Sequence, residues 1–546
     1  MFPMDTKELL QQNIAQSLKK LGLDFDASKI TIQNSKDVTH GDYATNVAMQ
    51  NCRLLQTNPV EAAKQIVANL DMSTIEHVEI AGPGFINFYM KKDSLTGIIA
   101  KIIKEDEKFG RSEKKNKKIN IEFVSANPTG DLHVGHARGA AIGDSIARIM
   151  EFDGYDVTRE YYINDAGNQI DHLAESILER LKEALDLPFK LPVDGYHGED
   201  VRLVALKIKD KLGDKYINAN LDKKEFIDEL KVLGMEYELE KIREDLKVYG
   251  IVFDVFSSEK VIRSNNGVEK ELQFLAPHIY EDNGAKVLKT TDYLDDKDRV
   301  IVKSNGEYTY FLPDIVYHVN KLSRGFDKLI DVLGADHHGY INRMKSALMM
   351  HGYDKDILDI ELIQMVRMMK DGEEFKLSKR TGNGYTLREL CQDVGVDAAR
   401  YFFVMRNASG HLDFDLDLAV KQSSDNPVYY AQYAHARLCS ILNSASDIEI
   451  DMEAKNLKEE SELALVKLLA NFPDIVKVAS KERAPYKITN YIHEIAEAIH
   501  AFYTECRVIN RDDLLVTSSR LSLCLASKII LRNALKLLGV SAPSRM

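Results

Sequence analysis

Ser125-Ala126-Asn127-Pro128-Thr129-Gly130-Asp131-Leu132-His133-Val134-Gly135-His136 connects a predicted strand to a predicted helix. Residues 119–124 form an apolar, β-branched run that is typical of a buried strand, and residues 137–150, rich in Ala and Ile, are typical of a helix. The start of a helix exposes backbone N–H groups and the positive end of the helix dipole, which suits phosphate. Gly135 leaves room for a flat ligand to approach the backbone. The two histidines therefore indicate a phosphate-binding loop.

Further strands are predicted over residues 156–162, 328–333 and 363–368, each followed by a polar loop. Strands that alternate with helices predict a parallel sheet with helices on both faces. Ligands of such sheets bind at the carboxyl ends of the strands, which is where all of these loops lie. We therefore predict a Rossmann-like catalytic domain whose site is built from several loops.

Taken alone, neither the histidines nor the lysines of the loop 370–383 are diagnostic. Two histidines three positions apart are more often surface or core side chains. A zinc site is disfavoured because the Glu of a His-Glu-x-x-His motif and a third ligand are missing. Lys376 and Lys379 fit an ordinary solvated loop as well as a pair of point charges that hold a leaving pyrophosphate.

The longer string from Ser125 to Gly139 resembles the ATP-binding signature of class I aminoacyl-tRNA synthetases, and of arginyl-tRNA synthetases in particular. Lys376-Leu377-Ser378-Lys379-Arg380 resembles the second signature of that class, Lys-Met-Ser-Lys-Ser, with departures at Leu377 and Arg380. The resemblance implies that ATP, with Mg2+ bridging its phosphates, is bound by His133, Gly135, His136, Lys376, Ser378 and Lys379. It also implies that the catalytic residues are His133, His136, Lys376 and Lys379.

An arginine site needs carboxylates for the planar guanidinium and polar groups for the main-chain end. The resemblance implies that Ser125, Asn127 and His136 hold the main-chain groups of arginine. It further implies that Tyr310, Asp314 and Glu122 bind the guanidinium and that His337 lies near another arginine-contacting position. Two alternatives stay open: Asp314 as an acid favoured by a helix N-terminus, and Glu122 as an edge-strand acid.

The predicted fold class is a multidomain α/β protein. An N-terminal α+β domain (1–95) and a linker (96–118) precede the catalytic domain (119–390), which carries a helical insertion at about 171–249, and an all-α domain follows (391–546). Gly41-Asp42-Tyr43-Ala44-Thr45-Asn46 resembles the family's N-terminal domain, which contacts tRNA. Gly395-Val396-Asp397-Ala398-Ala399-Arg400 resembles the Asp-Ala-Leu-Arg signature of its anticodon-binding domain. Tyr429, Tyr433 and Arg437 are candidate tRNA contacts, with aromatic core packing as the alternative.

The net charge and the spacing of the cysteines restrict the classes of protein to which this chain can belong. The net charge of −13 argues against general coating of nucleic acid, but residues 481–546 hold ten basic and six acidic side chains and are locally positive. The five cysteines form no Cys-x-x-Cys pair, which predicts no zinc site and suits a reducing compartment. No signal peptide and no apolar run of membrane-spanning length is evident. We expect a cytoplasmic protein that binds no membrane.

The resemblance implies an arginine–tRNA ligase that converts ATP, L-arginine and the arginine tRNA into arginyl-tRNA, AMP and pyrophosphate, acting as a monomer. Two other hypotheses remain. One is a different class I adenylate-forming enzyme. The other is a non-catalytic RNA-binding paralogue, although such a protein would be expected to lose residues such as His133 and Lys376, which are present.

Overall fold

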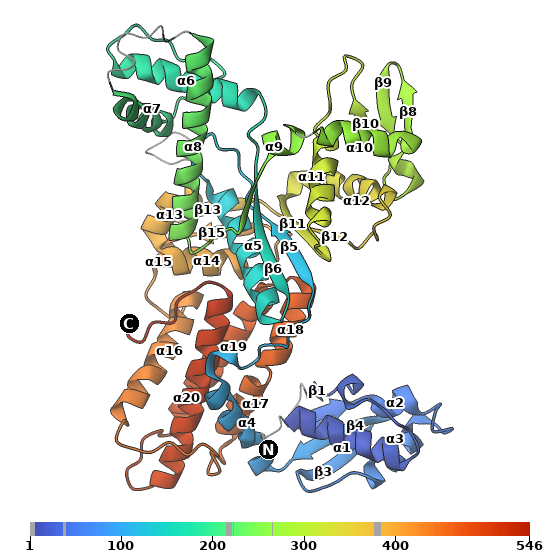
Figure 1. Cartoon of the computed structure of the whole chain (residues 1–546). Coiled ribbons are helices and arrows are strands. Elements are labelled where there is room, and N and C mark those ends of the chain that lie inside the picture. Colours follow the sequence, from blue (N-terminus) through green and yellow to red (C-terminus); the bar gives the residue numbers. More distant parts are fainter. Residues whose placement is uncertain (1–5, 36–39, 214–220, 222, 265, 376–383) are drawn as a thin grey trace.

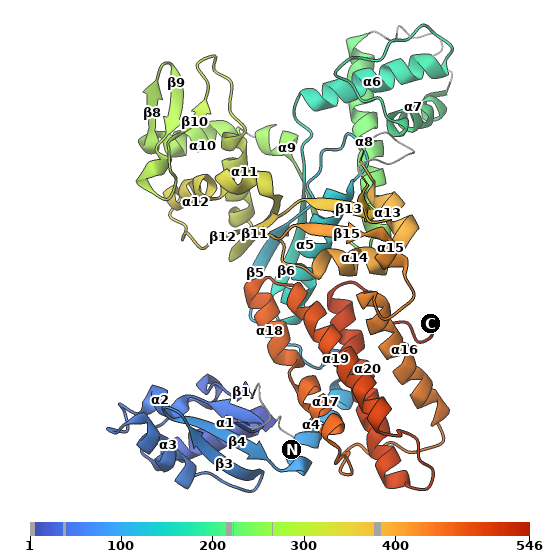
Figure 2. The same cartoon turned by 180° about the vertical axis from the view of Figure 1, so that it is seen from behind.

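The molecule is elongated, with a parallel sheet near its middle (Figures 1 and 2). This computed structural model describes residues 6–35, 40–213, 221, 223–264, 266–375 and 384–546. Two arms project from one end of the sheet, a helical domain packs at the other end, and a small α/β domain lies beside the far end of those helices.

The small domain is an antiparallel sheet covered by helices. Its strand order is β1 (Gln33–Asn34), β2 (Tyr43–Thr45), β4 (Phe85–Met90) and β3 (Ile75–Ala81). Helices α1 (Thr6–Lys20), α2 (Val47–Asn51) and α3 (Pro59–Ala68) accompany it. Helix α3 starts as its sequence predicts, because Asn58 caps it by accepting a hydrogen bond from the N–H of Glu61.

The central sheet is parallel throughout, which confirms the predicted fold class. Its strand order is β12 (Leu358–Ile363), β11 (Lys328–Gly334), β5 (Lys118–Glu122), β6 (Asp156–Ile163) and β7 (Val255–Ser258). The chain builds outward from β5 through β6 to β7 and later fills the other side with β11 and β12. The strand order thus reverses between β5 and β11, and ligands of open α/β sheets bind at such a point.

Helix α5 (Val134–Phe152) packs tightly on this sheet. Its residue Gly143 lies so close to β5 that an added Cβ would be 2.5 Å from Cγ of Phe123. Only glycine permits that approach, so the start of the helix is fixed relative to the end of the strand.

One predicted strand is wrong. Residues 363–368 do not form a single strand: β12 ends at Ile363, and β13 (Val366–Lys370) begins a separate small sheet with β14 (Glu373–Glu374) and β15 (Leu412–Asp415). The chain leaves the main sheet at Gln364, whose N–H donates to the carbonyl of Ala408. A continuous apolar run does not indicate this change of partner.

Each arm has a core of its own. The first arm consists of α6 (Asn168–Ala184), α7 (Glu199–Leu212) and α8 (Lys224–Val248). The second arm is built from α9 (Glu259–Ser264), α10 (Gly267–Leu275), β8 (Ile279–Asp282), β9 (Ala285–Leu288), β10 (Arg299–Val302), α11 (Phe311–Ser323) and α12 (Ile341–Met350).

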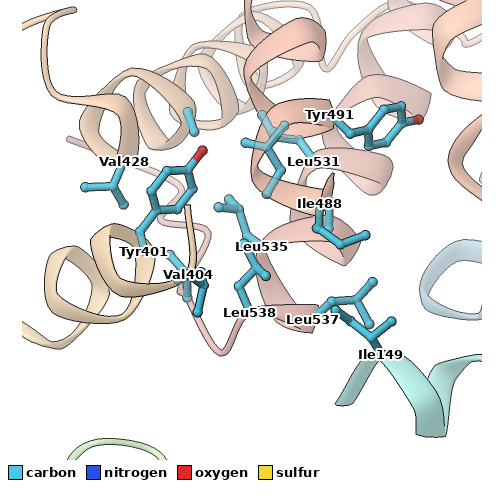
Figure 3. Packing of buried hydrophobic residues seen from close by; sticks show 14 of the residues in the cluster. Ile149, Tyr401, Val404, Val428, Ile488, Tyr491, Leu531, Leu535, Leu537 and Leu538 are labelled. Atoms are coloured by element: carbon cyan, nitrogen blue, oxygen red, sulfur yellow. The ribbon is translucent and has the colours of Figure 1, made fainter. Parts of the chain in front are cut away.

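The C-terminal part is helical, as predicted. It contains α13 (Leu387–Val394), α14 (Val396–Val404), α15 (Leu416–Val420), α16 (Pro427–Ser444), α17 (Glu460–Ala470), α18 (Phe472–Glu482), α19 (Tyr486–Glu505) and α20 (Leu514–Leu537), and α4 (Lys92–Glu105) packs against α17 and α20. Figure 3 shows Tyr401 and Val404 beside Leu535 and Leu538, with Ile149 of α5 at the edge of the same cluster. Catalytic and C-terminal parts therefore share one core.

Arg400, the arginine of the Asp-Ala-Ala-Arg string, joins three parts of the chain inside that core. Its fully buried guanidinium donates to Asp144 of α5 (2.6 Å) and to the carbonyls of Tyr249 (3.1 Å) and Leu538 (2.8 Å). Such charge-assisted bonds fix the orientation of the C-terminal helices on the sheet.

Helix α20 changes one expectation. By length and composition it could cross a membrane, although the sequence inspection found no run of that kind; 61% of its most apolar window is buried. Since α20 packs against α4, α16 and α19, its apolar residues serve the core of this domain.

Candidate active site

The two histidines form a reciprocal cap at the start of α5. The N–H of Gly135 donates to Nδ1 of His133 (3.1 Å), the N–H of His133 donates to Nδ1 of His136 (3.3 Å), and the rings stack with centroids 3.8 Å apart. Because each Nδ1 accepts, each Nε2 carries the proton and can donate to a ligand. Burial lowers the pKa of both side chains, that of His136 to about 3 with a further effect from His133. Both are neutral hydrogen-bond donors at pH 7.

The segment that follows the lysine loop lies beside these histidines. Lys376, Ser378 and Lys379 lie outside the described residues, whereas the structure describes Phe375 before them and Tyr385 after them. Before the loop, the N–H of Phe375 donates to the carbonyl of Met368 (2.7 Å). After the loop, the N–H of Val134 donates to the carbonyl of Tyr385 (3.1 Å), and Thr386 forms an isolated antiparallel β-bridge with His133. The chain just after the lysine loop is therefore fixed beside the histidine signature.

A buried lysine connects the end of β5 to the middle of β11. Glu122 and Asp331 are register partners on these strands, and Nζ of the fully buried Lys321 contacts Glu122 Oε2 and lies 3.0 Å from Asp331 Oδ1. Burial opposes the charge of Lys321, but the two carboxylates keep its pKa above the ordinary value. The other oxygen of Glu122 accepts the hydroxyl of Ser125 (2.9 Å). Both oxygens of Glu122 therefore have partners within the chain.

The loop after β5 is strained. Val124 and Ser125 have φ angles of 68° and 41°, a region that β-branched residues rarely adopt. Hydrogen bonds hold the loop in place, because the N–H of Tyr162 donates to the hydroxyl of Ser125 (3.1 Å) and the hydroxyl of Tyr161 donates to the carbonyl of Ala126 (2.8 Å). The Ser125 hydroxyl is thus fixed at the edge of the sheet, and the neighbouring Asn127 is exposed.

Helix α11 brings Asp314 to the same edge. The helix begins at Phe311, with Pro313 as its third residue. Tyr310 precedes the helix with its side chain 80% exposed, whereas Asp314 is partly buried and accepts a hydrogen bond from Tyr340. Exposed His337, in the 3-10 turn Ala335–Tyr340, lies with its ring 6.2 Å from that of Tyr340.

Glu259, which the sequence analysis missed, is a further acid at this edge of the sheet. It begins α9 directly after β7, contacts Arg263 and hydrogen bonds with Tyr162, and only 4% of it is exposed. Its position after a strand of the parallel sheet is the signal that could have identified it.

Asp314 is the acid in this group that lacks a cation. Glu122 and Asp331 share Lys321, Glu160 binds Arg324 (2.7 Å), and Glu259 pairs with Arg263. Among the described residues Asp314 forms no ion pair. Burial raises its pKa to about 7; His318 opposes this shift, and the carboxylates of Glu122 and Glu259 add to it. The edge of the sheet therefore offers a place for one added positive charge.

The predicted tRNA contacts lie elsewhere, on α16. The rings of Tyr429 and Tyr433 are 6.2 Å apart and nearly parallel, and the ring of His500 lies parallel to Tyr433 at the same distance. The exposed Arg437 lies 5.8 Å from the ring of Tyr503. These side chains form a row of rings on α16 and α19.

Family models match nearly the whole chain. "Arginyl tRNA synthetase N terminal domain" matches residues 8–90, "tRNA synthetases class I (R), catalytic domain" matches 98–438, and "DALR anticodon binding domain" matches 431–546. The Bacillus subtilis arginine–tRNA ligase is 47% identical over 551 residues, with 99% of each chain covered. The chain belongs to the arginyl-tRNA synthetase family.

Solved structures of this family have the same fold. A putative arginyl-tRNA synthetase from Campylobacter jejuni is 35% identical with a TM-score of 0.77, covering 84% of this chain and 100% of that one. The Thermus thermophilus arginyl-tRNA synthetase has a TM-score of 0.75 at 20% identity, covering 99% of this chain and 100% of that one. At that identity the likeness concerns the fold.

The described part of this arginyl-tRNA synthetase family member contains no group of three His, Cys, Asp or Glu side chains placed to hold a metal ion.

Proposed function

We propose that this chain is an arginine–tRNA ligase that activates L-arginine with ATP and transfers it to the arginine tRNA, releasing AMP and pyrophosphate. The observation that carries the proposal is Asp314, a carboxyl without a cation partner among the described residues, at the same sheet edge as the histidine cap. A guanidinium supplies the missing charge.

The amino-acid side is built around α11 and β5. Asp314 accepts the guanidinium N–H groups, with Glu259 nearby and Tyr310 and His337 at the rim. Glu122 does not contact the substrate itself, because its two oxygens are occupied by Ser125 and Lys321. It orients the hydroxyl of Ser125, which contacts the substrate. Ser125, Asn127 and His136 bind the main-chain amino and carboxylate groups.

The nucleotide side is built around the start of α5. Nε2–H of His133 and of His136 donates to phosphate oxygens, and Gly135 permits close approach of the ligand. Lys376, Ser378 and Lys379 bind the phosphates in this proposal, and the two lysines stabilise the departing pyrophosphate.

Mg2+ enters with ATP in this proposal. Phosphate oxygens and water would hold it, as is usual for this ion, and the described side chains form no group of three possible metal ligands. Its chemistry is to reduce the negative charge of the phosphates.

The chain itself mainly positions the reactants. The arginine carboxylate attacks the α-phosphate of ATP, the bond to pyrophosphate breaks, and arginyl-adenylate forms. Holding both substrates at one sheet edge removes much of the entropic barrier, and neutral histidines donate hydrogen bonds without adding a charge that would repel arginine.

For tRNA, the row of rings on α16 offers stacking surfaces for unpaired bases and Arg437 offers a phosphate contact. We further propose that the protein acts as a monomer in the cytoplasm. All five cysteines are free thiols, which suits a reducing compartment.

Substitution His136→Ala tests the proposed reaction. We expect charging of the tRNA with arginine to be abolished while tRNA binding stays within a few-fold, because the histidine contacts ATP and not tRNA. The measurement is tRNA charging with each of several amino acids. His278, a half-buried histidine on the second arm, is changed to Ala as the control and keeps wild-type charging. Charging with another amino acid in place of arginine, or unchanged charging by His136→Ala, refutes the proposal.

Arginine binding should weaken as the pH falls below 7. The raised pKa of Asp314, about 7, means that the empty carboxyl is protonated at lower pH, whereas bound guanidinium favours the ionised form. Proton and arginine therefore compete, and the Kd should be about tenfold larger at pH 6 than at pH 8. Calorimetry at both pH values measures this. Asp314→Asn should bind weakly with a flat profile; a flat profile in the unmodified protein contradicts the assignment.

Removal of one ring should weaken tRNA binding. Tyr433 is 40% exposed, and Tyr433→Ala should raise the Kd for the tRNA about tenfold because base stacking is worth about 1–3 kcal/mol. Tyr433→Phe should stay within twofold. Tyr280, 38% exposed on the second arm, provides the matched control, Tyr280→Ala. Equal Kd values for Tyr433→Ala and this control remove Tyr433 from the interface.

A further inference from the structure

Helix α8 belongs to two cores. Its first half, with Leu230 and Leu233, packs in the core of the first arm, and its second half, with Ile242 and Leu246, packs in the main core. Figure 1 shows it as one continuous rod from α6 and α7 to α13. A displacement of the first arm would therefore be transmitted through this one helix to the main core.

On its way α8 contacts the loop that precedes the histidine cap. Nζ of Lys241 lies 2.5 Å from Oδ1 of Asp131, with 22% and 28% of the two side chains exposed. Asp131 is two residues before His133. The adjoining Gly130 faces α7, because an added Cβ there would lie 3.3 Å from Oδ2 of Asp200. The arm thus approaches the ATP-binding loop closely.

One turn further along, α8 makes a second contact with the site. Nε of Arg388 donates to Oδ1 of Asp245 (2.7 Å), and Arg388 lies on α13, directly after the segment that pairs with His133. Lys241 and Asp245 are four residues apart and so share one face of α8. That face of α8 therefore contacts the loop before His133, through Asp131, and the start of α13 after Thr386, through Arg388.

Lys241 is the cation at the centre of an acidic group. Asp131, Asp200 and Glu238 surround it, and among the described residues they form no ion pair except with Lys241, which is 3.9 Å from Glu238 Oε2. Glu238 is fully buried, and neither of its oxygens has a hydrogen-bond partner in the described part of the chain. Without Lys241 the three carboxylates would repel one another, and the Asp131 loop, which is partly exposed, would move.

We propose that Lys241 is a positioning residue for ATP: by pairing with Asp131 it holds the loop that places His133 against the nucleotide. The inference rests on the proposed function, because it takes the histidine cap as the ATP site. Lys241 itself touches neither ATP nor arginine.

The test is Lys241→Met with Lys231→Met as the matched control. Lys231 lies on the same helix with 32% of its side chain exposed and forms a similar ion pair, 2.7 Å from Asp171 of α6, within the arm. We expect Lys241→Met to raise the Kd and KM for ATP about tenfold, since a misplaced loop can cost up to about a hundredfold. The KM for arginine should stay within twofold, as should both constants in Lys231→Met.

Two further variants separate positioning from folding. Asp131→Asn should give the same ATP-specific loss, the double variant with Lys241→Met should be no worse than either single variant, and Lys241→Arg should recover part of the affinity. Equal ATP constants for Lys241→Met and Lys231→Met overturn the inference, as do losses that add in the double variant. ATP binding is measured by equilibrium dialysis, which does not depend on tRNA charging. A wild-type protein that binds ATP but charges no tRNA would therefore refute the proposed function and leave the inference about Lys241 intact.

Discussion

A single buried ammonium group, that of Lys321, holds the two strands on which this site is built. It lies between Glu122 and Asp331, register partners on β5 and β11, at the point where the strand order of the sheet reverses. Loss of one partner in such a buried pair typically costs about 3–5 kcal/mol, because the other charge is left in a poor solvent. Lys321 also orients Ser125 through Glu122, and it lies on the same helix as Asp314.

The ion pairs around this lysine show which acids of the site have a cation partner within the chain. Five acids gather at or beneath the sheet edge, and the chain supplies cations for Glu122, Asp331, Glu160 and Glu259. Asp314, which has no cation partner among the described residues, is the acid that we propose for the guanidinium of the substrate. Strain at Val124 and Ser125 persists because hydrogen bonds with β6 and with the Glu122 carboxylate fix the loop, so the hydroxyl of Ser125 is held in one position.

Local patterns predicted the frame of the molecule. The strand before Ser125, the helix after His136 and the cap at Asn58 depend on neighbouring residues, and the structure has all three. Asp314 was proposed from its family resemblance. Lys321, Glu259 and Lys241 were missed because their partners are far away in sequence; Lys321 and Glu122 are 199 residues apart. The strand predicted over 363–368 was wrong because hydrophobicity does not distinguish one sheet from the next.

We propose that the pocket recognises a charge and not merely a shape. L-Citrulline has nearly the shape of arginine but is neutral, so it would leave Asp314 without a cation partner. This is tested by the ratio of kcat/KM for charging of the tRNA with arginine and with citrulline. We expect a preference for arginine of roughly 10⁴-fold, as for buried polar groups left unpaired, and a much smaller ratio in Asp314→Asn. Charging of citrulline within tenfold of arginine would show that the pocket does not recognise the charge.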